Sequence, residues 1–297
     1  MMCVRLILLL YLLGTALSHQ TLASDELKRI VSLSPAITAM LHELGREDRL
    51  VGVTRYCRQA PDNPRKLIVV GGAADPQVET ILTLKPDIVL ASSLLPENIE
   101  KRLIALGIPV QRFRQDRLRD ILQQVEWLGE HTASSDAAKH ALTHARNVMN
   151  RARVQNANLP HHTGLLVFSG EMNLVAGGGT YASEVMEFAG LENVAASLLQ
   201  SWPTISHEWL LAQNPHWILV ATRKSEVEDQ LDRKRLLAQW REHPIFSRLT
   251  AVQAGRVITI PQSRLVVPSL QVFEVMDSLR QQMQLFPEEG KLNHALD

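Results

Sequence analysis

The chain of 297 residues has no excess of either charge and, beyond residues 1–23, no apolar run long enough to cross a membrane. Lysine plus arginine and aspartate plus glutamate each number 31, without long runs of one sign, which argues against nucleic acid or an anionic membrane surface as partner. Enzyme motifs are also missing: the sequence has no Gly-x-x-x-x-Gly-Lys-Ser/Thr loop, no Gly-x-Ser-x-Gly elbow and no His-Glu-x-x-His pair. At this length, two lobes of about 100–150 residues are expected, each with its own core.

The apolar run that is present lies at the N-terminus. Arg5 supplies a cation, an apolar core follows from Leu6 to Leu13, and a polar stretch ends at Ala23. This is the layout of a cleaved secretory signal, and its core is too short for a bilayer of ~30 Å, which needs about 20 apolar residues. A buried N-terminal helix is the alternative, but the strand that begins near Arg29 leaves it little room to pack. The sequence therefore predicts an exported, soluble protein.

Cysteine is nearly absent. Cys3 lies inside the predicted signal, so the mature chain would keep Cys57 alone and could form no intramolecular disulfide. No cysteine directly follows the apolar core, so the pattern of a bacterial lipid anchor is missing as well. We expect Cys57 to be a packed thiol, and a soft metal ligand is the alternative.

Short apolar runs alternate with helical patterns along the rest of the chain. The runs predicted as strands are 30–33, 50–53, 67–70, 88–91, 110–113, 165–168, 217–221 and 257–260. Such alternation predicts α/β lobes with mainly parallel sheets, whose strands are covered on both faces.

The middle of the chain is different. From Ala133 to Asn156 it contains neither proline nor glycine and is rich in helix-forming residues. At 1.5 Å per residue, this helix would be roughly 35 Å long. We predict one rigid helix over 133–158 that joins an N-terminal lobe, 24–132, to a C-terminal lobe, 159–297, because a flexible linker would be richer in Gly, Ser or Pro.

One piece of the sequence occurs twice. The stretches PQVETILTLKPDIVLAS, at 76–92, and PTISHEWLLAQNPHWILVA, at 203–221, both read as a helix followed by a buried strand. Each has a glutamate near the start of the helix, Glu79 or Glu208, and a proline seven residues later. From the residues alone, both glutamates fit carboxylates that are favoured at a helix N-terminus by the macrodipole.

These segments carry a resemblance to a known family. Together with RIVSLSPAITAMLHELGREDRLVGVTRYC, VGG and AGRVITIP, they resemble the helical-backbone class of bacterial periplasmic substrate-binding proteins, which serve importers of cobalamin, ferric siderophores and haem. The similarity covers nearly the whole mature chain and is closest to the cobalamin binders. It implies two α/β lobes, a spanning helix and a ligand held in the cleft between the lobes. We expect a monomer without catalytic residues, cofactor or metal ligands of its own.

The resemblance also implies roles for individual residues. Glu79 and Glu208 match surface glutamates that meet arginines of the dimeric permease of an ABC importer. Ligand contacts are expected where strands end. The candidates are Tyr56, Arg58, Ser92, Phe168, Met172, Trp202 and Arg264. Tyr56, Phe168 and Trp202 match aromatic residues that contact cobalamin in the family, although each also fits ordinary packing.

Two positions depart from the family pattern. Ser92 stands where cobalamin binders tend to carry a tryptophan, and Pro268-Ser269-Leu270 lacks an arginine that many relatives place there. A ferric-siderophore or haem receptor of the same fold therefore stays open. For haem, Tyr56 is an available axial ligand, whereas His161 and His162 are expected in a solvated turn between the lobes.

One glycine-rich turn would also fit a different class of protein. An exported α/β enzyme could use the turn Gly177-Gly178-Gly179 to hold a phosphate, although a glycine turn before a helix is the more common meaning. The sequence favours a periplasmic receptor that captures a metal chelate, cobalamin or a related corrinoid, and delivers it to an ABC importer with little hinge motion.

The secretory interpretation can be tested directly. Cleavage after Ala23 would make the mature protein begin near Ser24. N-terminal sequencing of protein isolated from the periplasm checks this expectation. An intact Met1 in that fraction would contradict it.

Overall fold

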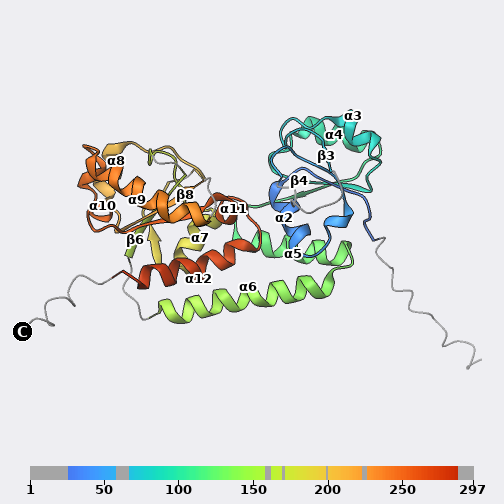
Figure 1. The fold of residues 1–297 in the computed structure, drawn as a ribbon. Coiled ribbons are helices and arrows are strands. Elements are labelled where there is room, and N and C mark those ends of the chain that lie inside the picture. Colours follow the sequence, from blue (N-terminus) through green and yellow to red (C-terminus); the bar gives the residue numbers. More distant parts are fainter. Residues whose placement is uncertain are drawn as a thin grey trace, which may run out of the picture.

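Two α/β lobes stand side by side above one long helix (Figure 1). The structure is a computed structural model, and it describes residues 26–57, 67–157, 162–168, 171–198, 200–222 and 226–286, without the side chains of 226–232. This arrangement confirms the predicted fold class of two lobes with parallel sheets joined by a spanning helix. The predicted signal, residues 1–23, lies outside the described residues.

The first lobe contains a sheet of five parallel strands in the order β3-β2-β1-β4-β5. The strands are β1 (Ile30–Ser32), β2 (Leu50–Val53), β3 (Ile68–Val69), β4 (Ile88–Ser92) and β5 (Val110–Phe113). Its helices are α2 (Pro35–Glu43), η1 (Glu47–Arg49), α3 (Val78–Thr83), α4 (Glu97–Ala105) and α5 (Leu118–His131). Side chains of β4 alternate between two cores: Leu90 packs with α2 and α5, and Val89 packs with α3 and α4 on the other face.

The second lobe contains a parallel sheet in the order β7-β6-β8-β9. The strands are β6 (His162–Val167), β7 (Leu191–Asn193), β8 (Trp217–Thr222) and β9 (Val257–Pro261). Its helices are α7 (Tyr181–Phe188), α8 (His207–Gln213), α9 (Glu226–Glu242), η2 (Phe246–Arg248), α10 (Thr250–Gln253), α11 (Gln262–Leu265) and α12 (Gln271–Gln284). The face with Leu166 and Leu219 packs with α7 and α12, and the face with Leu165 and Ile218 packs with α8 and α10.

The repeated piece of sequence is also a structural repeat. The segment α3–β4 places its strand between β1 and β5, and α8–β8 places its strand between β6 and β9. Ile81 and Leu210, at matching positions, are both fully buried. Lys85 (φ 45°) and Asn214 (φ 39°), also at matching positions, are both left-handed, and each lies after the end of its helix and one residue before its proline.

The long helix α6 (Ser135–Asn156) runs beneath both lobes (Figure 1). Its buried residues follow a helical spacing, so that one face is apolar. They are Ala138, Leu142, Ala145, Val148 and Ala152. A Cβ atom at Gly129 of α5 would lie 2.4 Å from Cβ of Ala138, so this glycine permits the close approach of the two helices.

The helix α12 lies alongside α6, a contact that the sequence did not predict (Figure 1). His144 and Arg151 of α6 pair with Glu274 (2.7 Å) and Asp277 (3.0 Å) of α12. As a result, one continuous apolar cluster contains side chains of both sheets and of α2, α5, α6, α7 and α12. The lobes share a core at their base and are joined by more than the connecting helix.

A half-buried carboxylate also links the lobes. Glu43, the last residue of α2, accepts hydrogen bonds from the Ser269 hydroxyl (3.1 Å) and the Leu270 backbone N–H (3.2 Å) at the start of α12. Burial raises the pKa of Glu43, although these two bonds and the nearby His42 act in the opposite direction. Folding therefore makes this side chain easier to protonate than it is in the unfolded chain.

This shift predicts how Glu43→Gln changes stability with pH. Because the pKa is raised, the contribution of neutral Glu43 is fully present below its unfolded-state pKa and is lost as the pH rises through its folded-state pKa. Glutamine keeps an acceptor oxygen and does not ionise. We expect the Tm of Glu43→Gln to exceed that of the wild type at neutral pH and to match it below about pH 4.

Thermal unfolding of both proteins across this pH range measures the difference. Glu47→Gln, at an exposed glutamate near the same helix end, is the control and should show a smaller pH-dependent difference. An equal Tm difference at every pH would contradict the assignment to Glu43.

Candidate functional site

The candidate ligand residues lie at the carboxyl ends of the strands in both sheets. In the first lobe, Tyr56 follows β2 and Ser92 is the last residue of β4. In the second lobe, Phe168 follows β6 and Arg264 lies in α11, directly after β9. Ligands of open α/β sheets bind at this edge, where the loops between strands and helices carry side chains. The placement fits the sequence-based expectation, and the ligand-binding roles stay predictions.

Three aromatic rings gather at this edge of the second sheet. The ring centroids of Phe168 and Trp202 are 5.0 Å apart, and those of Tyr181 and Trp202 are 6.1 Å apart, both with edge-to-face geometry. Trp202 keeps 41% of its surface exposed. An indole that two rings hold in place while it remains accessible is suited to stacking on a flat, apolar ligand.

Tyr181 is the member of this aromatic group that the sequence analysis missed. Its ring is buried, and its hydroxyl donates a hydrogen bond to the backbone carbonyl of Val266 (2.9 Å). Burial raises the pKa of Tyr181, so the phenol remains a neutral donor at neutral pH. One local feature of the sequence could have located Tyr181. Thr180 caps α7 by accepting the Ser183 N–H (3.1 Å), so Tyr181 is the first helical residue.

The glycine turn before α7 has a packing role. A Cβ atom at Gly177 would lie 2.1 Å from the carbonyl oxygen of Gln200, and one at Gly178 would lie 1.9 Å from that of Ala196. The N–H of Gly177 donates to the carbonyl of Ser201 (2.9 Å). A phosphate cradle needs backbone N–H groups that point at the ligand, and this one already has a partner.

In the first lobe, Tyr56 is the most accessible candidate. Its residue surface is 65% exposed, so the ring is not part of the core. The guanidinium of Arg55 lies 5.7 Å from the ring centroid and is itself held by Asp75 (2.6 Å). Ser92 is buried, and its hydroxyl accepts a hydrogen bond from the N–H of Leu94 (3.4 Å).

The remaining candidates are placed less favourably for contact with a ligand. Met172 has a positive φ of 52° and is fully buried in the apolar cluster of the second lobe. Arg58 lies outside the described residues. The thiol of Cys57 is buried 3.1 Å from the hydroxyls of Thr38 and Thr54, which fits the packed thiol that the sequence predicts.

Glu79 and Glu208 occupy the first turns of α3 and α8. Their own backbone N–H groups, followed by the Arg102 guanidinium for Glu79 and the Ser206 hydroxyl for Glu208, lower the pKa of each carboxyl. Both side chains are exposed and stay charged at neutral pH. Arg102 of α4, 2.6 Å from Glu79, is a partner that the sequence analysis missed.

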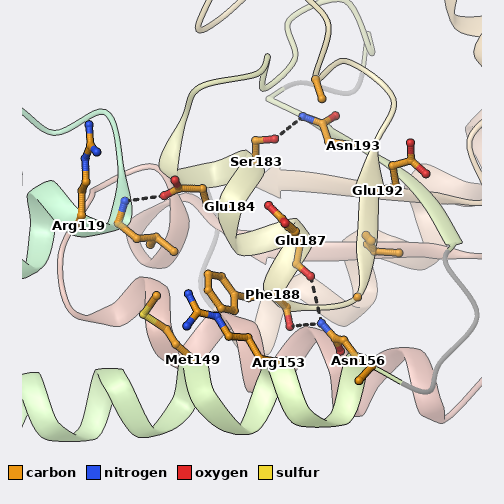
Figure 2. Close-up of a pocket in the computed structure, with 15 residues that line it drawn as sticks. Arg119, Met149, Arg153, Asn156, Ser183, Glu184, Glu187, Phe188, Glu192 and Asn193 are labelled. Atoms are coloured by element: carbon orange, nitrogen blue, oxygen red, sulfur yellow. Dashed lines mark hydrogen bonds between the residues drawn. The ribbon is translucent and has the colours of Figure 1, made fainter.

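A cavity of about 960 Å³ lies elsewhere, where α5, α6 and α7 meet (Figure 2). Its walls include Arg119, Met149, Glu187 and Phe188, and the guanidinium of Arg153 lies 5.3 Å from the centroid of the Phe188 ring. The candidate ligand residues do not line it. Its rim carries charges of both signs, so it does not select a ligand of one charge.

Neither a cluster of metal ligands nor a membrane-spanning helix is found among the described residues. In these parts of the chain, His, Cys, Asp and Glu side chains do not converge in groups of three or more that could hold a metal ion. Nor does any helix there combine the length and the hydropathy of a membrane span.

Comparisons with known proteins agree with this architecture. Residues 30–263 match the model of a family described as periplasmic binding protein. A vitamin B12-binding protein of Yersinia pestis is 30% identical over 214 residues, which cover 72% of this chain and 76% of that protein. Among solved structures, the periplasmic vitamin B12-binding protein of Vibrio cholerae has a TM-score of 0.72 at 23% identity, over 88% of this chain and 98% of that one. A periplasmic haem-binding protein of Pseudomonas aeruginosa has a TM-score of 0.71 at 26% identity, over 86% and 92%.

Proposed function

Because the chain belongs to the periplasmic binding protein family, we propose that it is the periplasmic receptor of an ABC importer and that it captures cobalamin or a related corrinoid. The observation that carries the choice of ligand is the aromatic group of Phe168, Tyr181 and Trp202 at the carboxyl edge of the second sheet. The 30% sequence identity to a vitamin B12-binding protein supports the same choice of ligand. The N-terminal signal would export the protein to the periplasm.

The proposed binding mode follows from the exposed aromatic side chains. A corrin ring is large and partly apolar, and an aromatic side chain buries roughly 150–250 Å² when it is covered. Trp202 from the second lobe and Tyr56 from the first are both exposed at strand ends, where they can contact a ligand held between the lobes. Because the lobes share a core at their base, we propose that the ligand enters with little hinge motion.

Haem is the second candidate ligand, and the exposure of Tyr56 favours it. Haem iron needs an axial side chain, and a tyrosine phenol can serve. The sequence-based placement of His162 in a turn is wrong: it is the first residue of β6, at the opposite end of that strand from Phe168. His161 lies outside the described residues. Titration with haem and with cyanocobalamin, followed by absorbance, distinguishes the two ligands, and a ferric-siderophore panel covers the third.

The enzyme alternative loses its main support in the structure. It depended on the turn from Gly177 to Gly179. Gly177 and Gly178 are explained by close backbone contacts with residues 200 and 196, and Gly179 is explained by its positive φ of 80°. The family match is to a binding protein. We therefore propose no catalytic role.

We further propose that Glu79 and Glu208 dock the receptor on a dimeric permease. Both are exposed, charged and located at matching positions of the structural repeat, one on each lobe. A dimeric permease with two-fold symmetry presents the same arginine-bearing surface twice. Charge pairs at the edge of that interface would set the orientation of the bound receptor and its association rate. At the first lobe, a permease arginine would have to replace Arg102 on Glu79.

Trp202→Ala tests the ligand site. If the indole stacks on the corrin, its removal should weaken cyanocobalamin binding by about 1–3 kcal/mol, the scale for burying a large apolar side chain. Trp202→Phe should recover part of the loss, because a ring remains. Isothermal titration calorimetry measures both, and an unchanged affinity of Trp202→Ala would assign the indole to packing alone.

Glu79→Ala and Glu208→Ala test the docking surface. Each should impair uptake by the reconstituted importer while leaving ligand affinity and Tm nearly unchanged, and the double variant should be worse than either single one. Glu79→Lys and Glu208→Lys should reduce uptake more than the alanine substitutions, since a lysine would face the permease arginines with a like charge.

The transport assay needs equal amounts of folded receptor and one matched control. Glu97→Ala removes another exposed glutamate of the first lobe, one that pairs with Lys101 on α4, and should leave uptake unchanged. If the two residues were only helix-terminal carboxylates, the double variant would lose stability and keep full uptake per folded molecule.

A further inference from the structure

Two glutamates reach from one lobe to the start of a helix in the other. Glu43 of α2, in the first lobe, accepts hydrogen bonds from Ser269 and from the Leu270 N–H at the start of α12. Glu184 of α7, in the second lobe, accepts the Leu118 N–H (2.7 Å) at the start of α5, together with the Arg117 guanidinium (3.2 Å). Figure 2 shows the bond from Leu118 to Glu184 beside the cavity. We name this pair of contacts the reciprocal caps.

Both helices need an acceptor from outside. The first N–H groups of a helix have no partner within it, and the partial positive charge there favours a carboxylate. The N-cap residues of α5 and α12 are Arg117 and Leu270. A guanidinium is only a donor and a leucine side chain has no polar atom, so neither can cap its own helix. Each helix takes the acceptor for one of its first N–H groups from the opposite lobe.

The local alternatives are already in use. In α5, the carboxylate of Asp120 accepts the N–H groups of Asp116 (3.1 Å) and Arg117 (3.0 Å), which leaves the Leu118 N–H for Glu184. At the start of α12, the hydroxyl of Ser269 accepts the next N–H, that of Gln271 (3.4 Å). The cross-lobe bonds therefore do not duplicate bonds within a lobe.

The two contacts run in opposite directions between the lobes. The helix α5 packs on the first sheet with α2, and its start is held by α7 of the second lobe. The helix α12 packs with α7 on the second sheet, and its start is held by α2 of the first lobe. Any separation of the lobes must leave two buried or half-buried helix N–H groups without their acceptors, which opposes opening.

We propose that Glu43 and Glu184 are positioning residues that fix the separation of the two lobes. Glu43 is the last residue of α2, and Glu184 lies in the first turn of α7, one turn after Tyr181. Each carboxylate is engaged by backbone of the opposite lobe, so it acts on a ligand through lobe geometry. This inference rests on the two-lobe fold and requires no particular ligand.

Hydrogen exchange tests the caps at the atoms concerned. In Glu43→Ala/Glu184→Ala, the amides of Leu270 and Leu118 should exchange roughly 2- to 30-fold faster, the change that corresponds to a loss of about 0.5–2 kcal/mol for an N-cap. The matched control is Glu47→Ala/Glu187→Ala, which removes one exposed glutamate near α2 and another in α7, one turn after Glu184. Exchange at both amides in the control should equal that of the wild type.

The separation of the lobes is measured in the same variants by electron spin resonance. Spin labels at Lys101→Cys in the first lobe and Arg248→Cys in the second, in a Cys57→Ser background, report the distance between lobes in the ligand-free mature protein. A narrow distribution is expected for the wild type and for the control. The double alanine variant should show a broader one with a population at longer distance, which loss of helix stability alone would not produce.

Faster exchange with an unchanged distance distribution would overturn the proposal and leave the glutamates as helix caps only. If circular dichroism shows that the double variant does not fold, Glu184→Ala and Glu43→Ala are measured singly with the same labels. Unchanged distributions in both folded single variants would overturn the proposal as well.

Discussion

The apolar contact between α6 and the helices above it determines how the rest of the molecule is arranged. The helix presents small and medium side chains along one face, and Gly129 lets α5 approach it closely. The same face receives α12 from the second lobe, so one apolar cluster extends through the base of both lobes. Since each sheet packs on these helices, the contact also fixes where the carboxyl ends of the two sets of strands lie. The candidate ligand residues depend on a core to which they contribute little.

Four glutamates of this chain lie at helix N-termini. Glu79 and Glu208 belong to the first turns of their own helices and face solvent. Glu43 and Glu184 serve the starts of helices in the opposite lobe. The physical interaction is the same in all four cases, and burial decides its consequence. An exposed carboxylate remains available to an external cation, whereas a half-buried one between the lobes is committed to its N–H donor.

Local signals explain which parts of the fold the sequence could predict. The strand at 88–91 is a buried apolar run after Pro86, and the helix over 133–158 contains no glycine or proline from Ala133 to Asn156, so both were visible. The strand β7, Leu-Glu-Asn, was not visible, because it is three residues long and forms only by pairing with β6. The contact of α12 with α6 depends on tertiary packing, and neither segment has a local sequence pattern that predicts it. In the candidate site, the strand ends were enough to place Phe168 and Tyr56 at the carboxyl edges of their sheets. Tyr181 was not predicted, because its hydrogen-bond partner, the Val266 carbonyl, lies 85 residues away in the sequence.

The position of α12 at the end of the described chain has a consequence for biosynthesis. A polypeptide emerges from the ribosome or a translocation channel from its N-terminus, so the first sheet and α6 are complete before Gln271 appears. Until then, the face of α6 that α12 will cover stays open to water, as does the side of α7 that packs against α12. The first lobe can acquire its sheet early, but the common base closes only when the last helix arrives. A nascent chain of this protein therefore carries an exposed apolar surface from the synthesis of α6 until α12 has emerged.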